Sequence, residues 1–375
     1  MTRKTKILQV LPSLNVEDVP HSRIQLAKFL VQSGYDSYVL SNGGNMRETL
    51  EKAGVKHFNL PVHKKDLFSF RTISKIRSLL LKEQFDLIHV RSRIPTWLVY
   101  KALKQIPPDN RPKLVTTFNG YYSIDEFSET IIKGDAIICP SKSVRNFILD
   151  HFAFTKKKDL NVIHKGVDSK KLPYGFEPNS KWLQQWTDES DSFKDKFKIT
   201  LPGRISSRKG LHDFLHIFYY LKKDGLPIHG LIIGSVDSQK ENYYSRLKSD
   251  IRRLGLTDDI SILNDRRDLR EIMKVSDLVL SCSIIPEAFN KACLMALSIG
   301  VPVIAYSHGI LKEQLNALYP YGMVEANKKS TMRLKIREFY KLKDKPKPNK
   351  NDQFTTDCAH KKVLSVYEEL LLKSA

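Results

Sequence analysis

The sequence predicts an α/β protein with two doubly wound domains, in each of which helices cover both faces of a parallel sheet. Three observations predict this fold class. The 375 residues are enough for about two domains. Short apolar segments without polar alternation recur along the chain, as in strands that are buried on both faces. Helical patterns separate these segments, which is typical of doubly wound α/β folds.

The first predicted domain extends over residues 1–170. Its candidate strands are residues 6–11, 37–41, 87–90, 114–118, 136–139 and 161–164. Over residues 23–31, apolar side chains recur three and four positions apart, which predicts a helix between the first two strands. The basic start of the chain is followed by a short apolar run that stops at Pro12. We interpret this run as the first strand, because it is too short for a secretory signal.

A polar segment with Trp182 and Trp186, residues 171–195, predicts a linker with a short helix. The second predicted domain, residues 196–345, again alternates strands and helices. Its candidate strands are residues 198–201, 230–233, 260–263, 277–280 and 302–305, and its candidate helices lie near 211–222, 240–254, 268–275, 288–299 and 329–342. Residues 346–375 predict a charged connector and a final helix over 362–372. We expect ligands in a cleft where the carboxyl ends of the strands of the two domains face each other.

The net charge of +21 predicts anionic partners. Nucleic acid is disfavoured, because the basic residues are dispersed and no zinc-finger spacing, aromatic RNA-binding motif or recognition helix accompanies them. An anionic membrane surface fits better, at about 1 kcal/mol for each cation near the surface. The alternative is a well-solvated basic surface without a specific partner. The candidate basic clusters are Lys64 with Lys65, Arg71 with Lys75 and Arg77, residues 156–158, and residues 341–347.

Four scattered cysteines without CxxC spacing argue against a disulfide framework or a zinc site. No apolar run approaches the roughly 20 residues that span a bilayer. We therefore expect a cytoplasmic protein that is peripheral on the inner face of the cytoplasmic membrane.

The most informative motif is Gly203, Arg204, Lys209 and Gly210, which lies between a predicted strand and a predicted helix. Two cations beside a helix N-terminus favour a diphosphate, because both the side chains and the free backbone N–H groups attract negative charge. The alternative is a solvated basic loop that happens to contain two glycines.

Glu287, in the sequence Pro286-Glu-Ala-Phe289, follows a strand and precedes an apolar helix, so we expect it at a helix N-terminus on the edge of the cleft. A carboxylate there can accept hydrogen bonds from sugar hydroxyls. Its alternative role is to stabilise the helix dipole by about 0.3–1 kcal/mol. Further along, Gly309 belongs to a turn whose amides could meet a phosphate, and His308 beside it is interpreted as structural.

In the first predicted domain, Asn119 and Gly120 end one strand and Arg91 follows another, so we expect all three on the acceptor side of the cleft. A solvated turn is the alternative for Arg91. The sequence contains no dinucleotide-binding fingerprint, P-loop, HExxH or GxSxG motif. No cluster of aspartates at a strand end calls for a divalent metal, so we expect neither a metal nor a cofactor.

Taken together, these residues resemble the GT-B fold glycosyltransferases of family 4 (glycosyl transferases group 1), close to bacterial lipopolysaccharide-core and related envelope sugar transferases. The resemblance covers nearly the whole chain and is strongest over residues 199–318. It implies two facing Rossmann-like domains, a nucleotide-sugar donor as co-substrate in the second domain and an envelope glycan or glycolipid acceptor in the first. Sugar transfer would then be metal-independent and would retain the anomeric configuration.

The resemblance also implies residue roles. Arg204 and Lys209 hold the diphosphate, and Glu287 holds hydroxyls of the donor sugar. The remaining donor-binding positions are Gly203, Gly210, Phe289, Asn290, Met295 and Gly309.

The chain departs from the family pattern at four places. Met295 stands where a second glutamate usually binds the ribose, Asn290 where a glycine is usual, and Asn119 where a histidine is frequent. Residues 15–21 replace a glycine-rich loop. Losing the ribose contact weakens donor binding by about 1–3 kcal/mol. These departures leave a second hypothesis, a catalytically impaired relative that acts as a sugar-binding or scaffold protein. A nucleotide-sugar epimerase is disfavoured, because we identify no acid and histidine partners for it.

Overall fold

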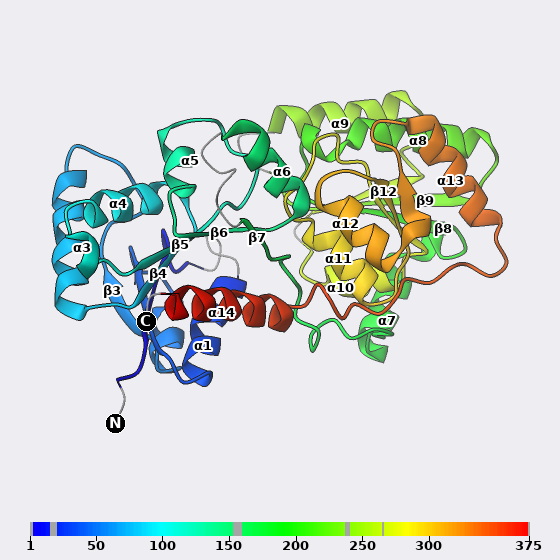
Figure 1. Cartoon of the computed structure of the whole chain (residues 1–375). Helices are drawn as coiled ribbons and strands as arrows, with labels where there is room; N and C mark the ends of the chain where they lie inside the picture. The colour runs from blue at the N-terminus through cyan, green and yellow to red at the C-terminus, as the bar shows by residue number, and fades with distance from the viewer. Residues whose placement is uncertain (1–2, 16–20, 153–159, 237–240, 265, 374–375) are drawn as a thin grey trace. The chain divides into compact units, whose positions relative to one another are not determined.

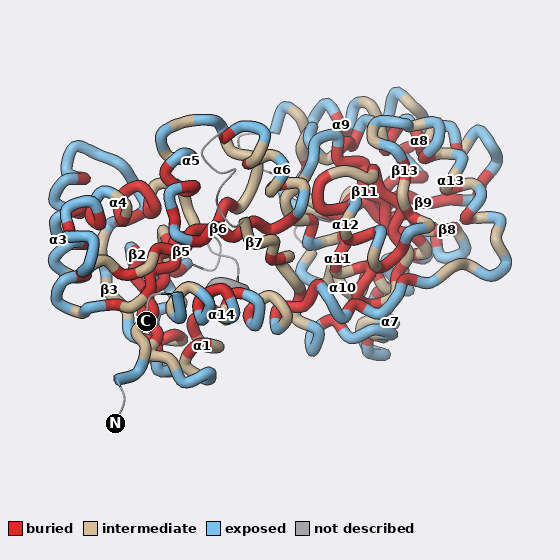
Figure 2. Tube along the Cα trace, in the orientation of Figure 1, coloured by how far each residue is buried: buried red, intermediate tan, exposed pale blue. Residues whose placement is uncertain are grey.

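The computed structural model describes residues 3–15, 21–152, 160–236, 241–264 and 266–373. The chain divides into two compact units, which we call the first unit (Met1–His164 with Thr356–Ala375) and the second unit (Lys165–Thr355). Each unit has its own parallel sheet and its own core (Figures 1 and 2). The expected α/β class with two Rossmann-like domains is confirmed.

The first unit is built on a seven-stranded parallel sheet in the order β3-β2-β1-β4-β5-β6-β7. Its strands are β1 (Lys6–Val10), β2 (Asp36–Ser41), β3 (Lys56–Asn59), β4 (Leu87–Val90), β5 (Lys113–Thr117), β6 (Ala136–Cys139) and β7 (Leu160–Val162). Its helices are α1 (His21–Gln32), α2 (Arg47–Glu51), α3 (Ser69–Glu83), α4 (Arg93–Leu103), α5 (Glu126–Ile131), α6 (Lys142–His151) and α14 (Thr356–Leu372). The order of the strands reverses between β1 and β4.

Helices cover both faces of this sheet. Leu8 of β1 packs with the α3 and α4 side chains on one face, whereas its neighbour Ile7 packs with α1 and α14 on the other. Successive side chains of a strand point to opposite faces, so both must be apolar where both faces are covered. This explains why the strands are short apolar runs rather than alternating patterns.

The second unit is built on a six-stranded parallel sheet in the order β10-β9-β8-β11-β12-β13. Its strands are β8 (Phe197–Pro202), β9 (Ile228–Ile233), β10 (Ile260–Leu263), β11 (Leu278–Ser281), β12 (Val303–Tyr306) and β13 (Met323–Val324). Its helices are α7 (Ser180–Glu189), α8 (Leu211–Lys223), α9 (Glu241–Arg253), α10 (Leu269–Lys274), α11 (Lys291–Ser298), α12 (Gly309–Leu318) and α13 (Lys329–Lys341).

The strand order of the second sheet reverses between β8 and β11, which pair directly with each other. At such a reversal the connections from two adjacent strands leave toward opposite faces. This opens a crevice at the carboxyl ends, where ligands of open α/β sheets bind. The loops that follow β8 and β11, residues 203–210 and 282–290, therefore hold the most favourable position of this unit for a ligand.

The boundaries of the units differ from those predicted. The expected linker, residues 171–195, is part of the second unit, because Trp186 and Phe193 pack on Leu231 and Ile233 of β9. The expected C-terminal segment, residues 346–375, is divided between the units. Its helix α14 inserts Tyr367 into the core of the first unit. Both differences arise from long-range packing, which local patterns do not record.

Among the described elements, β3, β13 and α12 gave no signal that we interpreted as a strand or a helix. Strand β3 is short and only partly buried, and β13 has two residues, so neither gives an apolar run. Helix α12 begins at Gly309, in a turn whose amides we interpreted as a possible phosphate contact and not as the start of a helix. The basic cluster at 156–158 and most of segment 15–21 lie outside the described residues. No helix in the described part of the chain combines the length and the hydropathy needed to cross a membrane.

Candidate active site

Three loops meet at the carboxyl edge of the second sheet. A Cβ atom on Gly210 would lie 1.8 Å from the carbonyl oxygen of Cys282, and one on Gly309 would lie 2.6 Å from that of Glu287. Both glycines also have positive φ, +68° and +55°. The loops after β8, β11 and β12 therefore touch through their backbones, and only glycine fits at these two contacts.

Backbone hydrogen bonds fix the same arrangement. The N–H of Ile284 donates to the carbonyl of Arg208 at 3.1 Å, and that of Ile310 donates to the carbonyl of Glu287 at 2.9 Å. The Nε2 atom of His308 lies 2.7 Å from the carbonyl oxygen of Ser283. Because a carbonyl only accepts, that nitrogen carries the proton, and His308 holds two loops together as we expected of a structural histidine.

Lys209 and Glu287 form an ion pair at the centre of this arrangement. The Lys209 Nζ lies 2.8 Å from Oε2 and 3.0 Å from Oε1 of Glu287. Both side chains are about one-fifth exposed, at 22% and 20%. The motif that contains Lys209 and the motif that contains Glu287 are 78 residues apart in sequence, and the fold brings their charged groups into contact.

Two further donors reach the same carboxylate. Ser283 donates its hydroxyl to Oε1 of Glu287, and the Nδ2 of Asn290 donates to that oxygen at 3.3 Å. Ser283 belongs to the motif that resembles the family, but it was not among the predicted site residues. A serine four residues before a loop glutamate is too common to identify without the fold. The carboxylate is thus oriented from three sides.

Arg204 differs from Lys209 because its guanidinium is exposed. No hydrogen bond or ion pair of its side chain is found among the described residues. Its neighbour Ile205 is anchored, since the Ile205 N–H donates to Ser235 at 3.0 Å. Gly203, on its other side, lies against Lys209, because a Cβ there would be 3.1 Å from Lys209 Cε. Of the two predicted diphosphate ligands in this loop, Lys209 is therefore paired and Arg204 is available.

Helix α8 begins directly after this loop. Gly210 is its N-cap, and no side chain caps the first turn. The backbone N–H groups at a helix start carry partial positive charge and favour anions. Strand, glycine turn and helix start are therefore arranged as the sequence predicted for a diphosphate site.

The position of Glu287 differs from our expectation. Helix α11 begins at Lys291, and Asn290 is its N-cap, whose Oδ1 accepts the Cys293 N–H at 3.0 Å. Glu287 lies three residues before this cap, in the loop, and so is not in the first helical turn. The backbone of this loop contacts Arg208 and Gly309, and the helix begins only after these contacts, at Lys291.

The remaining donor-side predictions lie on or near α11. Asn290 is buried and its amide is occupied by the cap and by Glu287. Phe289 and Met295 are partly buried against the core formed by α11 and α12. A thioether offers no strong hydrogen-bond acceptor, so Met295 supplies packing at this position.

In the first unit the structure brings together two of the acceptor-side predictions. The Nδ2 of Asn119 donates to the backbone carbonyl of Arg91 at 2.5 Å. The guanidinium of Arg91 is turned inward, where its Nη2 lies 3.4 Å from His89 Nδ1 and burial lowers its pKa. Tyr367 of α14 contacts the same His89. Arg91 is therefore largely committed to the interior, whereas Gly120 follows Asn119 in the partly exposed loop after β5.

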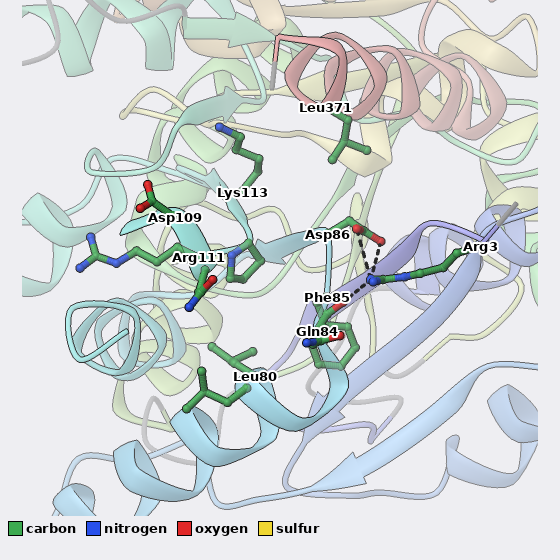
Figure 3. Close-up of a pocket in the computed structure, with 12 residues that line it drawn as sticks. Arg3, Leu80, Gln84, Phe85, Asp86, Asp109, Arg111, Lys113 and Leu371 are labelled. Atoms are coloured by element: carbon green, nitrogen blue, oxygen red, sulfur yellow. Dashed lines mark hydrogen bonds and ion pairs between the residues drawn. The ribbon is translucent and has the colours of Figure 1, made fainter. Parts of the chain in front are cut away.

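A cavity of about 570 Å³ lies at the opposite edge of the first sheet, beside the starts of β4 and β5 (Figure 3). On one side of it, Arg3 contacts Asp86, with Nη2 3.3 Å from Oδ1, so these two charges offset each other. Ligands of open parallel sheets bind at the carboxyl ends of strands. We assign this cavity no part in the candidate active site.

In the described part of the chain, no group of three or more His, Cys, Asp or Glu residues is placed to hold a metal ion. Burial raises the pKa of the Cys293 thiol to about 12 and that of the Cys282 thiol well above its usual value. Thiolate, the reactive form, is therefore scarce at both positions.

Two helix-covered parallel sheets, with a cationic glycine loop at the strand reversal of the second, define the GT-B class of glycosyltransferase folds. Comparison with known protein families also identifies glycosyltransferases. Residues 24–171 match Glycosyltransferase Family 4, and residues 184–354 match Glycosyl transferases group 1. The two matches together span most of the chain, which therefore belongs to this family of glycosyltransferases.

Solved structures support the same fold. A glycosyltransferase from Rickettsia africae ESF-5 is 25% identical, with coverage of 98% of this chain and 99% of that one and a TM-score of 0.82. Anabaena Alr3699/HepE, solved with UDP and glucose, is 16% identical with coverage of 99% and 97% and a TM-score of 0.68. The lipopolysaccharide outer core galactosyltransferase WaaB is 13% identical with coverage of 99% and 98% and a TM-score of 0.65.

Among curated proteins, the glycosyltransferase MJ1069 of Methanocaldococcus jannaschii, itself uncharacterised, is 25% identical over 178 residues. The match covers 46% of this chain and 41% of the archaeal protein, so it spans less than half of that relative.

Proposed function

We propose that this protein is a retaining glycosyltransferase that moves a sugar from a nucleoside-diphosphate sugar to an envelope glycan or glycolipid. The observation that carries the proposal is the Lys209–Glu287 pair beside the available Arg204, at the strand reversal of the second sheet. Cations at this position stabilise the charge that develops on a departing diphosphate. The carboxylate is oriented to accept hydrogen bonds from sugar hydroxyls.

The donor half of the proposal requires Lys209 to share its ammonium between Glu287 and phosphate. An ammonium has three donor hydrogens and the carboxylate uses at most two of them, so one stays available. Arg204 adds a guanidinium suited to bidentate phosphate contact. UDP sugars are the first donors to test, because Alr3699/HepE has been solved with UDP-glucose. We expect neither a divalent metal nor a further cofactor.

The acceptor half rests on the family resemblance, the fold likeness and the charge of the chain. The resemblance to envelope sugar transferases and the fold likeness to WaaB favour a lipopolysaccharide-like acceptor. The net charge of +21 favours attachment to an anionic membrane, and cysteines without pair spacing fit the cytoplasmic side. We propose that Asn119 and Gly120 contact the acceptor. Arg91 contributes indirectly, because its backbone carbonyl accepts a hydrogen bond from Asn119 and so positions that side chain.

The test measures donor binding and transfer in one set of variants. Calorimetry with UDP, GDP and their glucose conjugates is expected to give micromolar binding for one base, and Arg204→Ala is expected to weaken it roughly 10-fold or more. Arg246→Ala is the matched control, since Arg246 is an exposed arginine on α9 of the same unit. Transfer to an envelope acceptor extract should fall with Arg204→Ala, and the anomeric configuration of the product reports retention. Unchanged binding in Arg204→Ala refutes the assigned diphosphate site.

Met295 favours a second candidate, a sugar-binding or scaffold protein with impaired catalysis. Its partly buried thioether gives the ribose no strong acceptor. This candidate predicts no turnover of any bound nucleotide sugar with any envelope extract. Turnover by the wild type separates the two candidates. Met295→Glu tests the position of the ribose, because it should strengthen UDP binding if the ribose lies there.

A further inference from the structure

An apolar loop projects from the first unit just before and within the start of α3. Leu67, Phe68 and Phe70 are exposed by 90%, 57% and 63%. Three large apolar side chains within four residues are costly to leave in water, and such groupings mark interaction surfaces. Figure 2 shows this loop and the outward side of α3 as exposed. We call Leu67, Phe68 and Phe70 the apolar tip.

The local structure holds the apolar tip outward. The Asp66 carboxylate accepts the Phe68 N–H at 3.0 Å, and the Ser69 hydroxyl accepts the Asp66 N–H at 2.9 Å. These reciprocal bonds fix the turn, while Ser69 itself is buried. Leu67 and Phe68 are thus kept from folding back onto the sheet.

Cations surround the apolar tip. The Arg71 guanidinium lies 5.0 Å from the ring centre of Phe68 and 5.6 Å from that of Phe70. Lys75, Arg77 and Lys82 continue along exposed positions of α3. Phe70 and Leu81 are eleven residues apart, about three helical turns, so they lie on one side of α3, with the exposed polar residues Ser74 and Ser78 between them.

Acidic side chains near the apolar tip are already paired. Asp66 is 3.2 Å from Lys64 Nζ, and this contact helps to lower the pKa of its carboxyl. Glu126, on α5, is 3.6 Å from Lys101 Nζ and accepts the indole N–H of Trp97 at 2.8 Å. The surface therefore keeps a net positive charge around a protruding apolar group.

We propose that the apolar tip inserts into an anionic lipid bilayer while the cations of α3 bind its headgroups. A protein partner would be matched by a groove or a flat patch, whereas a narrow tip between cations fits the apolar interior and charged surface of a bilayer. The inference rests on the membrane attachment proposed above, and it assigns that attachment to α3 of the first unit. It is independent of donor binding.

The experiment measures cosedimentation with vesicles made of equal parts phosphatidylcholine and phosphatidylglycerol. The triple variant Leu67→Ser, Phe68→Ser, Phe70→Ser is expected to bind at least about tenfold more weakly than the wild type. The control variant Ile124→Ser, Leu334→Ser removes apolar side chains of similar exposure from elsewhere and should bind within about twofold of the wild type. Circular dichroism and the melting temperature check that each variant is folded.

A second measurement distinguishes insertion from surface attraction alone. Phe68→Trp should give a blue-shifted emission with anionic vesicles and no shift with pure phosphatidylcholine. Binding of the wild type should partly survive high salt, because apolar insertion is not screened.

The outcomes separate the two proposals. If the wild type binds anionic vesicles and the triple variant binds equally well, the apolar tip is not the insertion element, although membrane attachment stands. If the wild type does not bind anionic vesicles, both membrane attachment and insertion of the apolar tip are refuted. UDP binding still tests the proposed transferase activity separately. A wild-type dimer that the triple variant abolishes, without vesicle binding, would make this surface a protein interface and would also overturn the inference.

Discussion

We predict that two substitutions in the ion pair between Lys209 and Glu287 have different effects on UDP binding. Lys209→Ala removes a cation from the proposed diphosphate site, whereas Glu287→Gln removes the carboxylate that competes for it. If Lys209 binds phosphate, UDP binding should weaken in the first variant and not in the second.

The structure sets the size of these effects. A hydrogen bond to a charged group contributes about 1.5–3 kcal/mol, which corresponds to roughly 10- to 150-fold in the dissociation constant. Because both side chains are only about one-fifth exposed, the cost of desolvating them offsets most of their attraction, and the existing pair contributes a net of about 0–1 kcal/mol. Glu287→Gln should therefore leave the UDP affinity unchanged or raise it up to about fivefold.

Calorimetry with UDP and with UDP-glucose separates the diphosphate from the sugar. Lys209→Ala should weaken both ligands equally, because both contain the diphosphate. Glu287→Gln should remove any advantage of UDP-glucose over UDP and should lower the rate of transfer. Equal loss of UDP binding in the two variants would refute the reasoning, since the pair would then act only as a structural clamp. Arg246→Ala remains the control for overall charge.

Three further predictions concern stability. Gly210→Ala would force a Cβ to within 1.8 Å of the Cys282 carbonyl at a φ of +68°, so urea unfolding should show a loss above about 2 kcal/mol. Gly225→Ala, at a φ of +79° in open space, should lose only about 1–2 kcal/mol, and equal losses would contradict the clash. Desolvation lowers the pKa of His229 from 6.5 to about 4, so the unfolded chain takes up this proton first as the pH falls. Stability should decline between pH 6.5 and 4 by roughly 3 kcal/mol, and a His229→Gln variant with the same slope would exclude this cause. Asn290→Ala removes the cap of α11 and should lower the melting temperature through a loss of about 0.5–2 kcal/mol, whereas an unchanged melting temperature would count against the cap.

Much of the fold was predictable because its signals are local. The runs at β1, β8 and β9 are apolar on both sides, and this pattern is enough to indicate a parallel sheet under two layers of helices. Elements at the edges were harder to predict. Strand β3 is partly exposed and β13 is minimal, so composition gave no signal for either.

The candidate site was predictable in its residues and less so in its contacts. Residue types and spacing identified Arg204, Lys209 and Glu287. Contacts between loops decided that Glu287 precedes the helix cap, that Ser283 donates to it, and that Lys209 rather than Arg204 is its partner. Arg91 likewise turns toward His89, which Tyr367 of α14 contacts from more than 250 residues away in sequence.

The sequence by itself determined the fold class, the glycosyltransferase family and the charged groups of the second unit, because these depend on apolar periodicity and on short motifs. Tertiary structure alone decided which strands lie at the reversal of each sheet and which cation is paired. It also showed that the apolar tip before α3 is exposed rather than buried. The physical reason is that pairing and exposure are properties of segments distant in sequence, whose contacts leave no local pattern in either segment.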